Sequence, residues 1–167
     1  MVIDNQLANY FIQRYMSFLM YVYQEHMGID KEKELLNKLA IGRDKYLNDR
    51  NILDTYLKKK KEKSSNVYEA IRSLEFDKWV YLRDTTKYSL FVRGNESASY
   101  AVLGLTQPIK EIFGYSGIYL ETGVMRLESK FVCDGLITNQ VQLGKNYCDH
   151  FNSVYKNTKS IGKFYKN

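Results

Sequence analysis

The chain has 167 residues, which suits one domain or one domain with a smaller subdomain. A composition of 44% hydrophobic and 26% charged residues excludes disorder over the whole length. The formal net charge of +6 permits an anionic partner without requiring one, and the 15 tyrosines suit half-buried positions and interfaces.

The N-terminal residues and the cysteines indicate a cytoplasmic protein. No basic segment and cleavage site mark a secretory signal, and the apolar run 15–23 is too short to cross a membrane. Cys133 and Cys148 are expected to be free thiols in a reducing compartment. Because no CxxC spacing occurs and the two histidines are far apart, we predict no metal site and no cofactor.

Apolar residues at spacings of three and four predict a helical N-terminal part. The expected helices span residues 5–26, 31–47, 51–57 and 67–74. Asp4 and Asp30 are expected to cap the first two helices, and Gly28 to end the first. The inner face of the second helix is expected to hold Leu35, Leu36, Leu39 and Tyr46. Gly42 should weaken that helix by about 1 kcal/mol relative to Ala.

The first helix, residues 5–26, carries two apolar faces. A helix with so wide an apolar surface is either central to a bundle or covered by a partner chain. The sequence leaves both alternatives open, so a homo-oligomer through this helix is one expectation.

From residue 75 on, aromatic and β-branched residues indicate strands. The expected strands span residues 78–83, 88–92, 97–103, 118–127 and 130–137. Gly94 is expected to take a positive φ in a hairpin loop, and Gly123 to mark a bulge or a close backbone approach. The Asp134–Gly135 pair is interpreted as a bulge within the last strand.

Two further helices complete the expected fold. A short helix with Pro108 in its first turn and Gly114 at its end lies between the third and fourth strands, and a final helix spans 139–156. The predicted fold class is α+β. A helical subdomain over residues 1–74 precedes a five-stranded, mostly antiparallel sheet over residues 75–167, with one inserted helix and a C-terminal helix.

The segment YAVLGLTQPI, followed by ETGVMRLESKFVCDGLI, resembles a module of uncharacterised bacterial and phage proteins. The matching residues are Tyr100, Gly104, Leu105, Thr106, Pro108, Ile109, Thr122, Phe131, Asp134, Gly135, Leu136 and Ile137. The chain departs from the module at Ser129, where Gly is usual, and at Cys133, where Tyr is usual. The module has no assigned activity, so the resemblance implies a sheet and a bacterial or phage origin but no function.

Asp134 is the candidate catalytic residue, because it lies between Cys133 and Leu136 and should be screened from water. One interpretation makes it a general base or a cation ligand, with Thr122 and Glu121 nearby. The favoured interpretation is a bulge or turn residue that bonds its own backbone, because Asp-Gly is a common turn pair. The histidines His26 and His150 stand near no recognisable nucleophile, and none of the common catalytic motifs occurs.

A lysine run is the strongest charge feature and supplies the candidate partner-binding residues. The run holds Lys58, Lys59, Lys60, Lys61 and Lys63. It could contact an acidic protein groove or a phosphate backbone, or simply be a solvated helix end. Because no arginine or aromatic residue interrupts it, the run does not suit base-specific reading.

Three functional hypotheses follow. The favoured one is a non-enzymatic binding or regulatory protein acting on an acidic protein or nucleoprotein partner, such as a phage or mobile-element inhibitor of a CRISPR nuclease. Nucleic acid would be contacted through the basic charge, and no membrane is involved. The second is a small hydrolase or nuclease-like enzyme centred on Asp134, and the third is an oligomeric structural protein that uses residues 5–26 as its interface.

Overall fold

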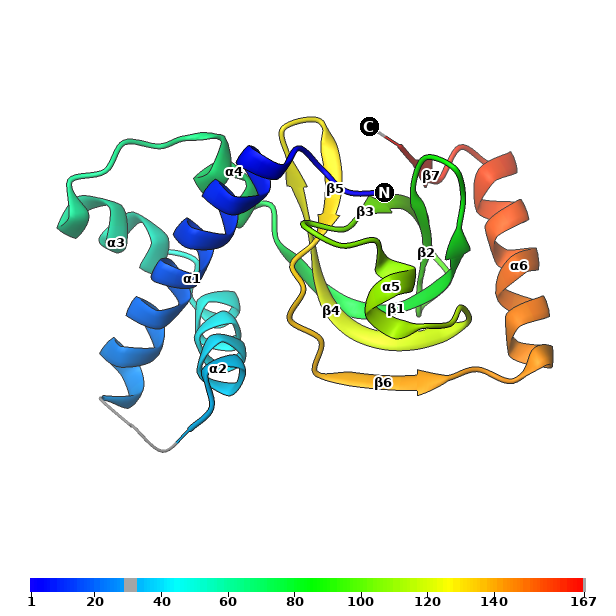
Figure 1. Cartoon of the computed structure of the whole chain (residues 1–167), viewed down its shortest axis with the longest axis horizontal. Coiled ribbons are helices and arrows are strands. Elements are labelled where there is room, and N and C mark those ends of the chain that lie inside the picture. The colour runs from blue at the N-terminus through cyan, green and yellow to red at the C-terminus, as the bar shows by residue number, and fades with distance from the viewer. Residues whose placement is uncertain (29–32, 167) are drawn as a thin grey trace.

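The computed structural model describes residues 1–28 and 33–166. Its N-terminal part holds α1 (Asn5–Met27), α2 (Leu35–Asn48), α3 (Ile52–Lys60) and α4 (Asn66–Arg72) (Figure 1). Asp4 caps α1 as expected, because its carboxylate accepts hydrogen bonds from the backbone N–H groups of Gln6 and Leu7, each at 3.0 Å. Gly28 ends α1 with a φ of 73°. The expected cap Asp30 lies outside the described residues.

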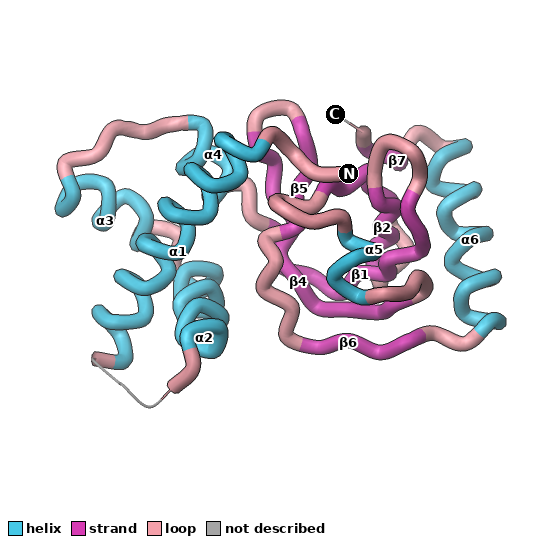
Figure 2. Tube along the Cα trace, in the orientation of Figure 1, coloured by secondary structure: helices cyan, strands magenta, loops and turns pink. Residues whose placement is uncertain are grey.

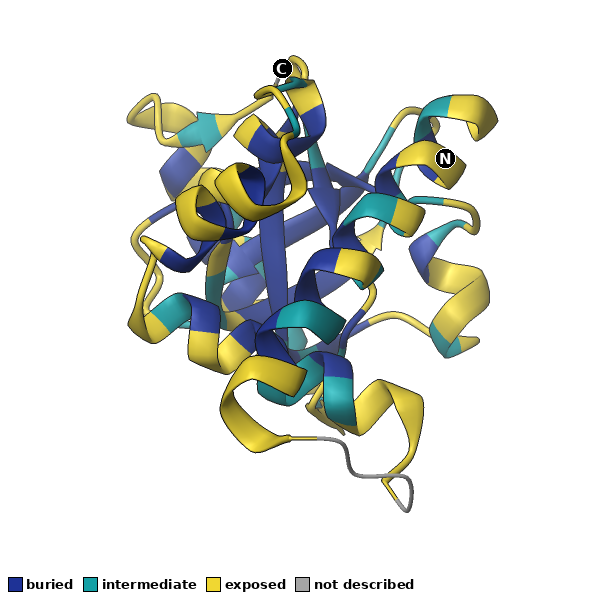
Figure 3. Cartoon of the chain, turned by 90° about the vertical axis from the view of Figure 1, so that its left-hand side faces the viewer, coloured by how far each residue is buried: buried dark blue, intermediate teal, exposed yellow. Residues whose placement is uncertain are grey.

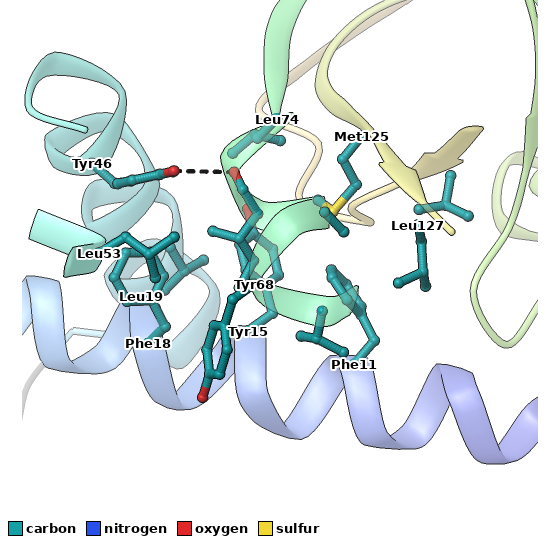
Figure 4. Packing of buried hydrophobic residues seen from close by; sticks show 14 of the residues in the cluster. Phe11, Tyr15, Phe18, Leu19, Tyr46, Leu53, Tyr68, Leu74, Met125 and Leu127 are labelled. Carbon is teal, nitrogen blue, oxygen red and sulfur yellow. Dashed lines mark hydrogen bonds between the residues drawn. The ribbon is translucent and has the colours of Figure 1, made fainter. Parts of the chain in front are cut away.

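α1 is the central helix of this part. Phe18 packs edge-on against Tyr46 of α2 and against Tyr56 of α3, with ring centroids 5.0 Å and 5.3 Å away. Figure 4 shows the cluster that results, in which side chains of α1 meet those of α2, α3 and α4 and of the sheet. The two apolar faces of α1 are therefore used by the chain itself.

The prediction for the inner face of α2 was half wrong. Leu39 and Tyr46 are buried, but Leu35 and Leu36 retain 50% and 65% of their exposed surface. Both stand in the first turn of α2.

The sheet has seven strands, where the sequence predicted five. They are β1 (Glu75–Asp84), β2 (Ser89–Arg93), β3 (Ser99–Leu103), β4 (Ile118–Leu127), β5 (Lys130–Cys133), β6 (Asn139–Gln142) and β7 (Phe164–Tyr165). The order is β1-β2-β3-β5-β4-β6, with β7 beside β3, and β1 also pairs with β4. Pairing is antiparallel except for β3 with β5 and β3 with β7. The α+β class is confirmed.

Because β1 pairs with both β2 and β4, five of the strands close into a small barrel (Figure 2). The barrel order β1-β2-β3-β5-β4, with α5 (Ile109–Phe113) between β3 and β4, is the Greek-key connectivity of the OB-fold. Connectivity describes the architecture and assigns no function. Trp79 and Tyr81 point into the barrel, where Ile109 of α5 packs with them.

The alternate residues of β1 and β2 point outward and are covered by α6 (Lys145–Ser160). Val80 and Val92 pack there against Phe151 and Val154. At β3 the hydroxyls of Ser99 and Thr158 lie 2.7 Å apart. The outer face of the first three strands is therefore buried under the C-terminal helix.

The expected start of the last helix at residue 139 was wrong. Residues 139–142 form β6, and α6 begins at Lys145. Backbone bonds hold this segment on β4, since the N–H of Thr138 donates to the carbonyl of Glu121 at 3.1 Å and that of Leu143 to Gly117 at 2.8 Å. At the far end of α6, β7 ties the tail to β3 through Phe164 and Tyr165.

Two expectations about single turns were also wrong. β5 ends at Cys133, and Asp134–Gly135 forms a turn, not a bulge, with Gly135 at a φ of 78°. In the β2–β3 loop the positive φ falls on Glu96, at 63°, and not on Gly94. Gly94 instead allows the β2–β3 loop to lie close to the backbone of Lys78 in β1, to whose carbonyl its N–H donates at 2.7 Å.

The helical part and the barrel share one hydrophobic cluster. Met125 and Leu127 of β4 pack with Phe11 of α1 and Leu74 at the end of α4 (Figure 4). The first residues join the barrel too, because the N–H of Ile3 donates to the carbonyl of Gly104 at 3.2 Å. Figure 3 shows that the exposed residues lie on the outer turns of the helices and on the loops around these buried strands. Within the described ranges, none of the helices has the length and apolar character that crossing a membrane requires.

Candidate functional site

Asp134 lies at the junction of the helical part and the barrel, directly after β5. Its carboxylate accepts five hydrogen bonds. Oδ1 accepts from the Thr122 hydroxyl at 3.0 Å, from the Gly123 N–H at 3.2 Å and from the Leu136 N–H at 2.9 Å. Oδ2 accepts from the Tyr15 hydroxyl at 3.2 Å and from Nη1 of Arg43 at 2.9 Å.

Arg43 is the residue of this site that the sequence analysis missed. It comes from α2, its side chain is fully buried, and its Nη1 also donates to the carbonyl of Leu136 at 2.5 Å. Its guanidinium stacks over the Phe76 ring, 4.4 Å from the centroid. The spacing of residues could have indicated that Arg43 is buried. It stands four residues after Leu39 and three before Tyr46, on the buried face of α2.

The geometry favours a structural role for Asp134. A carboxylate has about four lone-pair directions, and five donors leave none for a substrate proton or a cation. A general base must also reach the proton that it removes, and here a tyrosine and an arginine cover Oδ2. Asp134 bonds its own turn through Leu136, as the favoured interpretation expected, but it also joins three other segments of the chain, α1, α2 and β4.

Of the two other residues of the enzymatic hypothesis, Thr122 bonds Asp134 but Glu121 does not. Glu121 lies on the opposite face of β4 from Thr122, and its carboxylate accepts from the side-chain amide of Asn139 at 2.5 Å. Burial, with a smaller contribution from Asp134, raises the pKa of the Cys133 thiol to about 11, so this thiol is a poor nucleophile near neutral pH. The same two causes raise the pKa of Tyr15 well above its ordinary value.

A pocket of about 250 Å³ opens beside Asp134, between the helical part and the barrel. Its wall is largely apolar and comes from α1, α2, α5 and the segment before α5. Its lining residues include Ile12, Met16, Leu35, Leu36, Leu105 and Ile112. The exposed leucines of α2 thus belong to the pocket wall and not to the core.

The lysine run forms the C-terminal end of α3 and the turn after it, and its five lysines are exposed. We call Lys58, Lys60, Lys61 and Lys63 the lysine cluster, because within the described residues these four form no ion pair. Lys59 differs, since its ammonium pairs with Glu25 of α1 at 2.8 Å and lies 5.0 Å from the Tyr21 ring centroid.

Glu62, the one acidic residue inside the run, is held by other partners. Its carboxylate pairs with Nη1 of Arg14 at 2.7 Å and accepts a hydrogen bond from the Tyr68 hydroxyl. Glu62 accordingly raises the pKa of the Arg14 guanidinium. Lys61 permits this arrangement by taking a left-handed conformation, with a φ of 54°, directly after α3.

Both histidines have hydrogen-bonding partners within the chain. Nδ1 of His26 lies 2.9 Å from the carbonyl oxygen of Val22 one turn earlier, and Nε2 of His150 lies 2.7 Å from a carboxylate oxygen of Glu96. Among residues 1–28 and 33–166, no group of three His, Cys, Asp or Glu side chains could hold a metal ion. Comparison with protein-family models, curated proteins and solved structures finds no match to this chain.

Proposed function

We propose that this chain is a non-enzymatic binding protein whose lysine cluster docks on an acidic surface of a protein or nucleoprotein partner. The observation that carries the proposal is the position of Glu62. Because Arg14 and Tyr68 hold its carboxylate, the only acid within the run does not neutralise the lysines around it.

The cluster also stands on a rigid support. Leu57, just before it, and Val67 and Tyr68, just after it, are buried in the helical core, so both ends of the segment are anchored. An anchored backbone reduces the conformational freedom that the segment loses on binding, which favours association with a complementary surface. Lysine ammonium groups act as point charges, so they suit a carboxylate-rich protein surface better than bidentate recognition of bases.

The two alternatives have less support. For the hydrolase hypothesis, the hydrogen bonds of Asp134 leave its carboxylate no free direction toward a substrate. For the oligomer hypothesis, most of the apolar residues of α1 that motivated it are packed in the chain's own core, and Ile12 and Met16 line the pocket beside Asp134.

The test is a pull-down with tagged protein from host lysate, with and without nuclease, at two salt concentrations. The variant K58E/K60E reverses two cluster lysines. The control K45E/K145E reverses two exposed lysines elsewhere and changes the net charge equally. We expect one partner to survive nuclease, to bind the control variant and to be lost with K58E/K60E. Equal loss with both variants, or retention by both, would contradict the proposal.

A further inference from the structure

A second surface combines aromatic rings with cations at the opposite end of the molecule from the lysine cluster. Three rings meet there from three segments. The centroid of Phe164 in β7 lies 5.8 Å from that of Tyr88 in the turn before β2, and 5.3 Å from that of Tyr155 in α6. All three rings are half-buried, so part of each stays open to solvent.

Two cations lie over these rings. The Lys166 ammonium is 5.3 Å from the Phe164 centroid and 5.9 Å from that of Tyr88, and the Arg83 guanidinium is 5.8 Å from the Tyr155 centroid. Lys87 and Lys156, each next to one of the rings in sequence, are also exposed. We call these rings and cations together the aromatic–basic surface.

This surface has no neutralising acid among the described residues. None of its four cations forms an ion pair with a described carboxylate. Asp84, which follows Arg83, accepts hydrogen bonds from the hydroxyls of Tyr81 at 2.9 Å and Ser89 at 2.7 Å. Attachment of the C-terminal tail explains why Phe164 packs here, but it does not require unpaired cations around the rings.

We infer that the aromatic–basic surface binds single-stranded nucleic acid without sequence preference. Cations attract the phosphate backbone, and open ring faces stack on unpaired bases. An acidic peptide would pair with the cations but would make no stacking contact with the rings. The bases of duplex DNA are stacked on one another and cannot stack on the rings. Because Lys166 and Arg83 lie over the rings, both cations move from the rings to phosphates when bases stack there.

This inference concerns a different surface and ligand from the proposed function, so either can fail alone. The assay is fluorescence anisotropy with a labelled 20-nucleotide oligothymidine. The variant Y88L/Y155L removes two rings but keeps apolar packing, and Y147L is its control, because Tyr147 is an exposed ring of α6 without ring partners among the described residues. The variant K87E/K166E removes two cations, and K45E/K145E, which reverses two exposed lysines elsewhere, is its charge-matched control.

We expect Y88L/Y155L to weaken binding by about tenfold or more, since stacking on a ring contributes about 1–3 kcal/mol per base. K87E/K166E should reduce the slope of log K against log salt by about 1.4, or about 0.7 for each lost phosphate contact. Y147L and K45E/K145E should change the affinity by less than about twofold, as expected of surface changes away from the binding site.

Equal weakening by K45E/K145E would overturn the inference, because net charge would then be the cause. Unchanged binding by Y88L/Y155L would overturn it as well. If that variant does not fold, the wild-type protein still tests for stacking. An abasic oligonucleotide of equal length should bind the wild type at least about tenfold more weakly than oligothymidine does. Equal affinity for the abasic strand, or for a duplex, would exclude stacking.

Discussion

Arg43 and Asp134 are 91 residues apart in the chain, and their side chains meet at 2.9 Å with neither exposed to solvent. The pair joins α2 to the end of β5, so it links the helical part to the barrel. Nε and Nη2 of Arg43 are buried and donate to no described group. A buried ion pair with donors left over stabilises the fold less than its Coulomb attraction suggests, but losing either partner is costly.

We expect Arg43→Met to destabilise the protein by about 3–5 kcal/mol, because it leaves the Asp134 carboxylate buried without its cation. Urea unfolding followed by circular dichroism measures the change. Arg126→Met is the matched control, since Arg126 is exposed and forms no ion pair with a described residue, and it should change stability by less than about 0.5 kcal/mol.

The double variant R43M/D134N separates pairing from packing. If the ion pair is the cause, Asp134→Asn should cost much less in the Arg43→Met background than in the wild type, because the charge it removes is then already unpaired. Additive effects in this cycle would show that packing of each side chain, and not their interaction, determines the cost.

Gly42 sets the distance between α1 and α2. A Cβ at this position would overlap the backbone carbonyl of Leu19, so Gly42→Ala should destabilise the protein by about 1–3 kcal/mol. Helix propensity alone predicts the opposite sign, a gain of about 1 kcal/mol. Thermal or urea unfolding decides between the two, and Ala40→Gly in the same helix shows the size of the propensity effect alone. A more stable Gly42→Ala would mean that the helices separate at little cost.

Local sequence patterns predicted the elements whose signals are local. The cap at Asp4 and the bounds of β4 came from residue type and spacing alone. β6 gave no such signal, since all four of its residues are exposed and only the β4 backbone makes them a strand. Leu35 and Leu36 fit the apolar pattern of a core face, but the pattern cannot distinguish a core from a pocket wall.

The candidate site was predictable only in part for the same reason. Asp134 stands out in sequence because it is an acid within an apolar segment. Arg43 has charged neighbours and looks like a surface residue until α2 is placed against the barrel. The Glu62 side chain is held by Arg14, which lies 48 residues away in the chain. The sequence of the lysine run alone therefore does not reveal the orientation of Glu62.

The two cysteines should differ sharply in reactivity. Burial raises the pKa of the Cys133 thiol to about 11, so at pH 8 only about one molecule in a thousand carries the thiolate, and the group is screened from reagents. Cys148 is partly exposed. A thiol reagent such as DTNB should titrate one thiol in the native protein and two in urea, and Cys148→Ser should leave the native protein unreactive. Fast reaction of that variant would show that the β5 region opens readily.

Because of Tyr15, the free energy of unfolding should fall as pH rises in the alkaline range. Burial, followed by the charge of Asp134, raises the folded-state pKa of its hydroxyl above the ordinary value near 10. Its stabilising contribution is therefore fully present below pH 10 and is lost as pH rises toward the folded-state pKa, because only the unfolded chain releases the proton. At pH 11 this loss amounts to about 1.4 kcal/mol relative to pH 8.

Tyr15→Phe tests this contribution. At pH 8 it should cost about 1 kcal/mol for the lost hydrogen bond to Asp134. Between pH 8 and pH 11 its unfolding free energy should fall by about 1.4 kcal/mol less than that of the wild type. Urea unfolding at the two pH values measures both effects, with the exposed Tyr10→Phe as control. Parallel loss of stability in all three proteins would mean that Tyr15 ionises as easily in the folded chain as in the unfolded one.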